Sequence, residues 1–374
     1  MTILTLFYQV KHPLNESLRT QVLVLPAKHG DSIIVKTFDS QANPLNIVID
    51  GGTPGTFDEV LRREFKLIPI IDIMVLTHID YDHIGGLIKF VKHAYFNPEQ
   101  VKRYWFNSKN IKFTTVGDNI HSGHAKSFEE LLIDRGNIKD KWTEDIIVGS
   151  ELKMPEGITV EVVSPSKEIL DELYTNWPDL SDEYNQKLED LSISAVKPSQ
   201  ILRGSLVDLS KEDDTPDKTI IEDIFNSSSI AFILRTFDMS ILFLGDAHPY
   251  FIEETLRAKE YSIENKLKVD FVKVSHHGSK NNTTNALLDL IDCDKFVIST
   301  NGGNSTHTHP DRETLARIIH HPQRVQSKYI KKRTIYLNYP IANIEQKAGE
   351  FINEADLQQG NWELIENTGV LENE

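Results

Sequence analysis

The segment MVLTHIDYDHIGGL, residues 74–87, is the most informative stretch of this chain. Its apolar beginning is typical of a strand, and His78, Asp80, Asp82 and His83 follow directly after it. Imidazole and carboxylate groups are the ligands of hydrolytic divalent metals, and a loop after a strand can turn such side chains toward two ions. The alternative is a polar loop in which Asp82 caps the next helix, but a cap does not need two histidines and two carboxylates together. The pattern therefore predicts a metal-binding loop.

Short apolar runs rich in Val, Ile and Leu surround this segment and predict strands, because Gly, Asp or Pro residues bound them. Helical patterns such as 57–65 and 84–94 lie between or after these runs. Nearly continuous apolar strands need cover on both faces, so we predict the α/β class, with two mixed sheets between helical layers. The predicted strands fall in two groups: 20–27, 32–38, 45–50 and 72–77, then 229–237, 240–246, 269–275 and 295–300.

The predicted domain organisation is a single domain over residues 1–374 with one insertion and one extension. The segment 166–226 is acidic and polar, with helical periodicity and little strand pattern. About 60 polar residues bury little core unaided, so we interpret this segment as a cap or arm inserted into the domain. The region after about residue 340 is an acidic C-terminal extension with one further strand candidate, NWELIEN (361–367).

The composition limits the partners and the compartment. Across 374 residues, 40 Lys and Arg stand against 56 Asp and Glu, and the charge of −16 excludes a protein that coats nucleic acid along a broad basic face. The lone cysteine, Cys293, excludes an internal disulfide and a zinc site of clustered cysteines. The N-terminus lacks a basic leader, and no window reaches the roughly 20 apolar residues that cross a bilayer. We therefore expect a cytoplasmic protein without a membrane partner.

Two later segments place further ligand-type side chains after strands. SILFLGDAHP (240–249) carries Asp246, from which a carboxylate can bridge two ions, although a plain turn explains the Gly-Asp pair as well. DFVKVSHHGSKNNTT (270–284) ends a strand with His276 and His277. Either this pair is a satisfied surface feature, or one histidine is a ligand and its neighbour orients the substrate.

Together these segments resemble the metallo-β-lactamase superfamily: THIDYDH (77–83) is similar to its metal-binding loop, FLGD (243–246) to its bridging aspartate and SHHGS (275–279) to its late histidine. The order of the motifs is more closely similar to the hydrolase domains of ComEC competence proteins. Three other stretches support this, namely KHGDSIIV (28–35), NIVIDGG (46–52) and VISTNGGNSTHTHP (297–310). The resemblance covers roughly residues 20–165 and 226–320 and implies the αββα sandwich of that superfamily.

The resemblance also implies two divalent metal ions and assigns their ligands. The assignment is His78 and Asp80 for the first ion, Asp82, His83 and one of His276 and His277 for the second, and Asp246 as the bridge. Of the histidine pair, His277 is favoured. Asn226 stands where many superfamily members carry a further histidine. Since Asp80 and Asn226 offer oxygen in place of imidazole, the first site shifts from zinc toward manganese, with magnesium as an alternative.

The mechanism that the resemblance implies is in-line attack of a metal-activated hydroxide on a phosphodiester. The predicted catalytic residues are Asp82, through the metal that it holds, and His309, which protonates or stabilises the leaving oxygen. His307 is the weaker alternative to His309. The predicted phosphate contacts are Ser279, Lys280 and Asn281.

Three further features of the sequence each allow two interpretations. Asp31 and Asp50 either support the metal-binding loop through hydrogen bonds or form turns. The segment VKRYWFNSKNIKF (101–113) mixes basic and aromatic residues, which suits stacking on nucleic-acid bases, but burial of the aromatic rings in the core is the favoured interpretation. The basic run KYIKKR (328–333) either flanks the cleft or solvates a surface.

We therefore predict a metal-dependent hydrolase of phosphodiester bonds, first of all a DNA nuclease that acts with partner proteins, for example as a defence effector. The insertion 166–226 is a candidate lid or docking surface for a protein partner. The first alternative is hydrolysis of a small phosphodiester, such as a cyclic nucleotide or a phosphocholine ester, which the negative charge of the chain favours. The second alternative is a metal-stabilised binding module without catalysis, and the intact set of ligand-type residues speaks against it.

Overall fold

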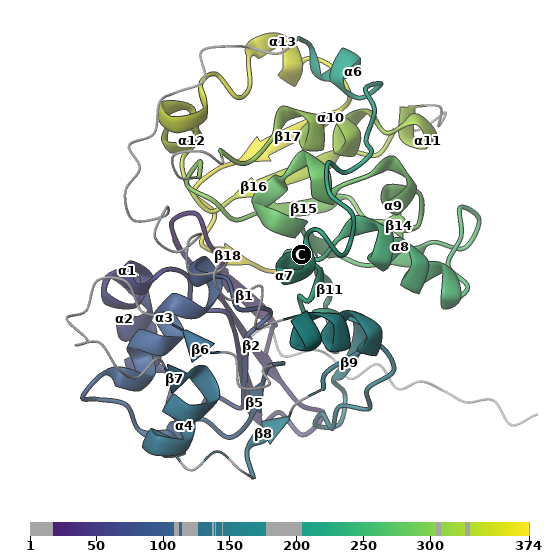
Figure 1. The fold of residues 1–374 in the computed structure, drawn as a ribbon. Helices are drawn as coiled ribbons and strands as arrows, with labels where there is room; N and C mark the ends of the chain where they lie inside the picture. Colours follow the sequence, from purple (N-terminus) through teal and green to yellow (C-terminus); the bar gives the residue numbers. More distant parts are fainter. Residues whose placement is uncertain are drawn as a thin grey trace, which may run out of the picture.

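Two seven-stranded sheets face each other, and helices cover their outer faces (Figure 1). This arrangement is seen in a computed structural model that describes residues 18–107, 112–113, 126–136, 138, 140–143, 145–176, 204–303, 308–325 and 330–373. The predicted αββα sandwich of the α/β class is thereby confirmed. In these described ranges, no helix is long and apolar enough to cross a bilayer.

The first sheet comes from the N-terminal part of the chain and is completed by a strand near the C-terminal end. Its strands β18, β1, β2 and β3 are antiparallel to one another, whereas β3, β4, β5 and β8 are parallel, so the sheet is mixed as predicted. In spatial order the strands are β18 (Val370–Leu371), β1 (Gln21–Val24), β2 (Ile33–Phe38), β3 (Pro44–Ile49), β4 (Ile73–Val75), β5 (Tyr104–Trp105) and β8 (Trp142–Thr143).

The second sheet is also mixed, with antiparallel strands at one side and parallel strands over the rest. The sequence patterns missed β9 and β16. In β16 the polar residues Arg333 and Thr334 are buried, and they interrupt the apolar run that would have marked a strand. In spatial order the strands are β17 (Trp362–Ile365), β16 (Arg333–Leu337), β15 (Lys295–Ile298), β13 (Phe271–Lys273), β11 (Ser240–Phe243), β10 (Ala231–Arg235) and β9 (Thr159–Ser164).

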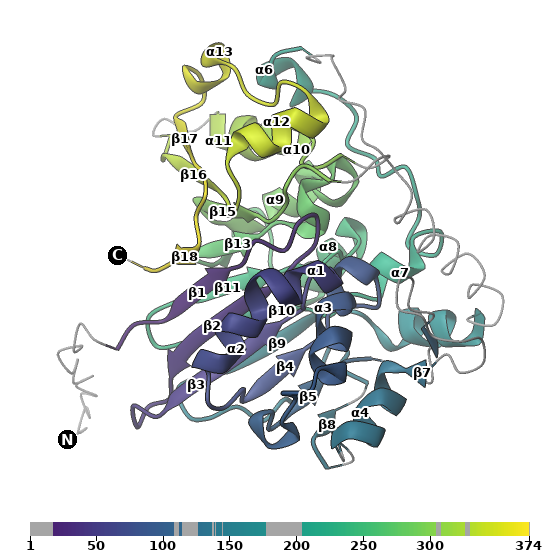
Figure 2. The ribbon, with the colours of Figure 1, turned by 90° about the vertical axis from the view of Figure 1, so that its left-hand side faces the viewer.

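One helical layer covers the outer face of each sheet (Figure 2). The first layer contains α1 (Pro54–Thr56), a π-helical turn (Phe57–Leu61), α2 (Arg62–Leu67), α3 (Tyr81–Lys92) and α4 (Phe128–Gly136). The second side carries α6 (Leu206–Leu209), α8 (Pro249–Ala258), α9 (Asn285–Asp289), α10 (Arg312–His320), α11 (Pro322–Val325), α12 (Ile341–Ala348) and α13 (Glu354–Leu357).

Short elements complete the described chain. Residues 167–176 of the predicted insertion are helical, and α7 (Ile224–Ser227) lies at its end. Three 3₁₀ turns lie at Pro98–Gln100, Ser275–Gly278 and Lys280–Asn282, and two small sheets pair β12 (Leu267–Lys268) with β14 (Ile291–Asp292) and β6 (Lys112–Phe113) with β7 (Lys126–Ser127).

The apolar core between the two sheets takes side chains from both, among them Val35 and Val75 from the first and Phe232 and Phe271 from the second. The aromatic residues of the segment 101–113 belong to the core. Trp105 packs between the sheets, and Tyr104 and Phe106 lie under the first helical layer; all three are almost fully buried. Their interpretation as core residues is confirmed, while the side chain of Phe113 lies outside the described residues.

The region after residue 340 is integrated into the sandwich rather than appended to it. Its strand β17 extends the second sheet, as the NWELIEN pattern predicts, and β18 pairs with β1 at the edge of the first. These two edge strands follow each other closely in the chain, since β17 ends at Ile365 and β18 begins at Val370, and the sheets that they join pack face to face (Figure 2). The C-terminal end of the chain therefore joins both sheets.

Candidate active site

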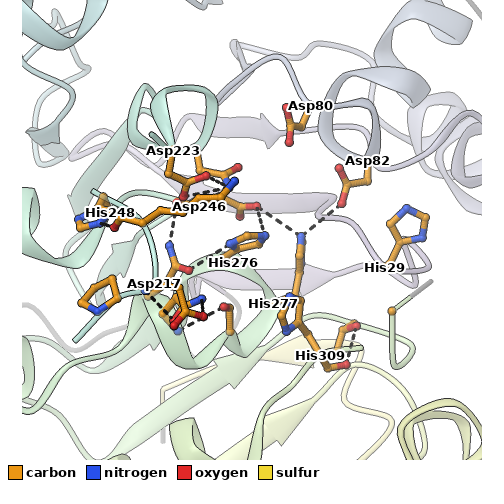
Figure 3. Close-up of a pocket in the computed structure, with 18 of the residues that line it drawn as sticks. His29, Asp80, Asp82, Asp217, Asp223, Asp246, His248, His276, His277 and His309 are labelled. Carbon is orange, nitrogen blue, oxygen red and sulfur yellow. Dashed lines mark hydrogen bonds and ion pairs between the residues drawn. The ribbon is translucent and has the colours of Figure 1, made fainter. Parts of the chain in front are cut away.

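The predicted site residues converge where loops of the two sheets meet. The loops after β4, β11 and β13 bring their side chains to one cavity of about 370 Å³ (Figure 3). Asp82 is far from Asp246 and His277 in the sequence, but the packing of the two sheets brings the three residues to the same cavity.

The metal-binding loop connects β4 to α3. Helix α3 begins at Tyr81, so Asp80 holds the N-cap position and Asp82 lies in the first turn. The alternative that Asp82 caps the helix is therefore wrong. The helix packs directly on the turn after β3, since a Cβ atom at Gly86 would lie 2.0 Å from the carbonyl oxygen of Gly51. This close approach needs glycine and fixes the loop against the first sheet.

Asp246 lies at the centre of the site. Its Oδ2 atom is 3.4 Å from Nε2 of His83, 3.6 Å from Nε2 of His277, 3.8 Å from Nε2 of His78 and 3.9 Å from Nε2 of His276. A carboxylate among four imidazoles is in the position of a bridge between ions, as the resemblance implies for this residue.

The other ring nitrogens of two of these histidines have fixed partners. Nδ1 of His83 donates to the carboxylate of Asp50 at 2.8 Å, and Nδ1 of His277 donates to the carbonyl oxygen of Ser299 at 3.0 Å. Asp50 also accepts from the backbone N–H of Thr77 at 2.8 Å and from its hydroxyl at 2.7 Å. These bonds turn the Nε2 atoms into the site, as outer partners do for histidine ligands.

A second buried carboxylate, that of Asp31, also supports the site. Asp31 forms an ion pair with the buried Lys273, and its other oxygen lies 3.6 Å from Nδ1 of His277. Burial raises the pKa of Asp31, but Lys273 and His277 outweigh burial and hold this pKa well below its ordinary value. The predicted support of the metal-binding loop therefore holds for Asp50, which accepts from Thr77 and His83. The side chain of Asp31 instead contacts Lys273 and His277, outside that loop.

The side chains fit a divalent metal in two overlapping clusters, each with ligand atoms within 4.8 Å of one another: His78, His83 and Asp246, and Asp82, His83 and His277. A third group, Asp31, Asp50 and His83, is occupied by the support bonds described above. Among the described residues, the buried Nε2 atoms of His78, His83 and His277 have no hydrogen-bond partner. Leaving such a group unpaired costs about 1–3 kcal/mol, and a cation would satisfy all three.

The electrostatics of the site favour positive charge. Burial lowers the pKa of His277, but the carboxylates of Asp246 and Asp31 outweigh burial and raise this pKa to about 10. Burial raises the pKa of Asp246, but His83, His277 and His276 lower it well below its ordinary value. A pocket that holds a proton on a buried imidazole this firmly also attracts a metal cation.

The histidine pair divides into two roles. His277 is buried beside Asp82, with Nε2 of His277 at 3.4 Å from Oδ2 of Asp82, whereas the side chain of His276 is 27% exposed and donates through Nδ1 to Asn282. Burial, which outweighs the effect of Asp246, lowers the pKa of His276 to about 4. The geometry therefore supports the predicted preference for His277 as the ligand. Asp80 and Asn226 line the same cavity and are nearly buried.

The predicted catalytic and phosphate-binding residues are brought together only in part. His309 and Ser279 line the cavity, and Nδ1 of His309 lies 3.4 Å from Asp311. Asn281 also lines it, but Asp217 engages both ends of its amide. Lys280 is not among the described residues that line the cavity, and His307 lies outside the described residues.

Apart from Asn226, the sequence reasoning did not single out the residues of the segment 166–226 that lie at this site. Four residues near its end line the cavity: Pro216, Asp217, Lys218 and Asp223. His248 joins them, but its Nδ1 accepts from the backbone of Tyr250 and its Nε2 donates to the carbonyl oxygen of Lys218, so it caps α8. His29 lines the opposite side of the cavity. Its place in the KHGDS stretch (28–32) was the sequence feature that could have marked it as a site residue.

The basic run 328–333 lies away from the cavity. Lys331 is 3.4 Å from Asp294 and Lys332 is 2.5 Å from Glu363. Asp294 precedes β15, whereas Ser299 of the site follows it, so these lysines lie at the opposite end of the parallel strands. The surface interpretation is confirmed for Lys331 and Lys332, whereas Arg333 is buried in β16 and donates to the carbonyl oxygen of Ile318.

The fold and the site together define an αββα-sandwich protein with a histidine- and aspartate-rich candidate metal centre. Comparison with known families agrees: the model of the metallo-beta-lactamase superfamily matches residues 45–159, so this part of the chain is similar to domains of that superfamily. Members of this superfamily are generally metal-dependent hydrolases.

The chain is also similar to ComE operon protein 3 of Bacillus subtilis (strain 168), with 22% identity over 260 residues. The match covers 70% of this chain and 24% of that protein, so the chain spans about a quarter of the length of this relative. The ComEC-like resemblance of the motifs is confirmed.

Solved structures with similar arrangements include a variant of the CmlA beta-hydroxylase, with a TM-score of 0.37 and 11% identity over 96% of this chain and 55% of that one. A long form of RNase Z from yeast has a TM-score of 0.37 and 12% identity over 97% of this chain and 42% of that one. A metal-dependent hydrolase from Parabacteroides distasonis has a TM-score of 0.31 and 10% identity over 93% and 98% of the two chains.

Proposed function

We propose that this chain is a metal-dependent hydrolase that cleaves phosphodiester bonds, with DNA as its first candidate substrate. The observation that carries the proposal is the position of Asp246, whose Oδ2 atom lies within 3.9 Å of four imidazole nitrogens from two loops. The two candidate clusters share His83, and Oδ2 of Asp246 in the first lies 3.6 Å from Nε2 of His277 in the second, so the two sets are close enough for a dinuclear centre.

The roles proposed for the side chains follow their positions. His78, Asp80 and Asn226 would hold one divalent ion, Asp82, His83 and His277 the other, and Asp246 would bridge them. Zinc and manganese are the proposed metals, with magnesium as the alternative, because the first set offers more oxygen than nitrogen. Bound there, such ions activate water as a nucleophile and neutralise charge on the phosphate.

His309 is the proposed donor of a proton to the leaving oxygen. Its ring centroid lies 5.3 Å from that of His276, on the side of the cavity away from the metal-binding loop (Figure 3). Asp311 near its Nδ1 atom orients the ring. A histidine at the wall of the cavity can reach a substrate oxygen that the buried ligands cannot.

DNA is proposed from the similarity to ComEC-type hydrolase domains, and the cavity favours a second candidate. Its volume of about 370 Å³ suits a small ligand, for which pockets of about 300–1,000 Å³ are usual. Among the described lining residues there are five aspartates, one lysine, Lys218, and no arginine. A small phosphodiester, such as a cyclic nucleotide or a phosphocholine ester, is therefore the alternative substrate.

The segment 166–226 is proposed as the place where a protein partner controls the site, and a role in defence would need such restraint. This is supported by its position, since its described end forms one wall of the cavity and is bound to it through Asp217 and Lys218. A partner that moves this wall would change access to the metal centre.

The test is cleavage of linear and circular DNA, a cyclic mononucleotide and bis(p-nitrophenyl) phosphate with added manganese, zinc or magnesium. The wild-type protein is compared with Asp82→Ala and His83→Ala, and Lys332→Ala serves as a matched surface control. We expect metal-dependent cleavage that both site variants lose and the control keeps. Two bound ions without hydrolysis of any of these substrates would contradict the phosphodiesterase proposal and favour a binding module.

A further inference from the structure

Asn226 is oriented by a single neighbour. Its side chain is 4% exposed, and its Nδ2 atom donates to both carboxylate oxygens of Asp223, at 3.0 and 3.2 Å. Its Oδ1 atom is buried and has no hydrogen-bond partner among the described residues. One end of the amide is therefore fully engaged, and the other end is left for a ligand.

The backbone holds this amide beside the metal-binding loop and the bridging aspartate. The carbonyl oxygen of Asn226 accepts from the N–H of Ser229 at 2.9 Å, and the next residue, Ile230, donates to the carbonyl oxygen of Thr77 at 2.8 Å. The hydroxyl of Ser229 accepts from the N–H of Asp246 at 3.2 Å. The turn at α7 is thus fixed to two of the three loops that carry the candidate ligands, those after β4 and β11.

We propose that Asp223 is a positioning residue of the metal centre: it orients the amide of Asn226 so that the oxygen, and not the amino group, faces the first ion. The proposal rests on the metal centre of the proposed function. The two ends of an amide have nearly the same size, but only the oxygen can coordinate a cation. A carboxylate accepts hydrogen bonds and cannot donate them when ionised, so Asp223 selects one of the two orientations.

This selection has a consequence for the choice of metal. An oxygen at this position adds a hard ligand to the first site, which favours manganese over zinc relative to an imidazole. An amide free to rotate would present its amino group for part of the time and would bind either ion more weakly. Asp223 therefore contributes to the affinity of the first site and to its preference for manganese.

The experiment measures binding of manganese and of zinc, each alone, to the metal-free full-length chain by calorimetry, with metal content by elemental analysis. Outer partners of metal ligands typically contribute about 10–100-fold to affinity, so Asp223→Ala should weaken one manganese site by this factor and leave the second unchanged. The loss should be larger for manganese than for zinc. Asp223→Asn keeps an acceptor oxygen and should lose less, which provides a readout if the alanine variant folds poorly.

Asp217→Ala is the matched control. Asp217 lines the same cavity on the same segment and also accepts from an asparagine amide, Nδ2 of Asn281 at 3.1 Å, but that asparagine is not a candidate ligand. If Asp223 acted only through its negative charge, both variants would weaken metal binding to a similar degree. That result would overturn the proposal.

A double-mutant cycle separates positioning from a direct effect. If Asp223 acts through Asn226, then Asp223→Ala should cause no further loss of affinity in an Asn226→Ala background. Losses that add would show that Asp223 contacts the ion or acts by charge, and the proposal would fail while the metal centre stands. A wild-type chain that binds neither metal would instead contradict the proposed function, and with it this inference.

Discussion

The two walls of the cavity differ in how they are held. The loop 78–83 carries the histidines His78 and His83, whose side chains are fully buried, and Asp50 and Thr77 hold it through side-chain hydrogen bonds. The opposite segment, 213–223, is mostly exposed and is held by amide and backbone contacts such as those of Asp217 and Lys218. Burial fixes the candidate metal centre, whereas the exposed wall can vary without dismantling it.

The largest effect is expected when Asp246, at the centre of the buried wall, is replaced. Asp246→Ala removes the carboxylate that four imidazoles surround, so we expect loss of both ions and a fall in activity beyond the roughly 100-fold that an outer partner contributes. Metal analysis and hydrolysis of bis(p-nitrophenyl) phosphate measure the two effects. A variant that keeps two ions per chain would show that Asp246 does not bridge them.

The next largest effect is expected when the hydrogen bonds that hold the loop 78–83 are removed. Asp50→Ala leaves the N–H and hydroxyl of Thr77 and Nδ1 of His83 without their acceptor. We expect metal affinity to fall about 10–100-fold and the free energy of unfolding to fall by about 1–3 kcal/mol for each donor left buried. Calorimetry and urea unfolding measure these changes. Asp171→Ala breaks an exposed pair with Lys167 and should cost less than about 0.5 kcal/mol.

The charge of the buried wall can be tested through pH. His277, with a pKa of about 10, and His83, whose pKa also lies well above its usual value because Asp246 and Asp50 outweigh burial, carry protons at neutral pH that a metal must displace. Metal affinity should therefore rise with pH, about tenfold per pH unit for each displaced proton. Calorimetry in buffers of different ionisation enthalpy counts the protons, and a pH-independent affinity would contradict this.

The metal-free chain should show the opposite trend in stability. The pKa of His277 is raised in the folded state from 6.5 to about 10, so its contribution is fully present below pH 6.5 and is lost as the pH rises through about 10. Thermal unfolding of the metal-free protein across this window measures the effect. His277→Gln should remove the part of this pH dependence that His277 contributes.

The exposed wall should give a smaller and different effect. Asn281→Ala removes both contacts of its amide with Asp217, so segment 213–223 should open more readily, at about 1 kcal/mol of local stability. We expect unchanged metal affinity, a severalfold change in KM and faster proteolysis within this segment. Equal loss of metal from Asn281→Ala and from Asp50→Ala would erase the contrast between the two walls.

The smallest effect is expected outside both walls. Lys331→Gln and Lys332→Gln remove exposed ion pairs at the far end of β16, so each should change stability by no more than about 0.5 kcal/mol. DNA binding should also stay within twofold of wild type. A large loss of DNA affinity would place a substrate surface at this end of the sheet.

The sequence predicted most of the buried wall and little of the exposed one. His78, Asp82, His83, Asp246 and His277 were found because each directly follows a strand in an unusual cluster of ligand-type residues. Asp217 and Asp223 were missed, since they lie in a polar segment that is rich in acidic residues and has no strand or motif to mark single positions. The prediction of Asn281 as a phosphate contact was incomplete for the same reason, because its partner comes from that segment.

What the sequence determined by itself is local: the alternation of strands and helices, the metal-binding motif at the end of β4 and the ligand-type residues after β11 and β13. Hydrophobic periodicity and motif spacing record such features because they depend on near neighbours. The packing of distant segments, in contrast, sets which residues stand opposite one another, such as Asp217 beside Asn281 or Asp31 between Lys273 and His277. Those pairings result from the packing of two sheets and an inserted segment, and no spacing along the chain encodes them.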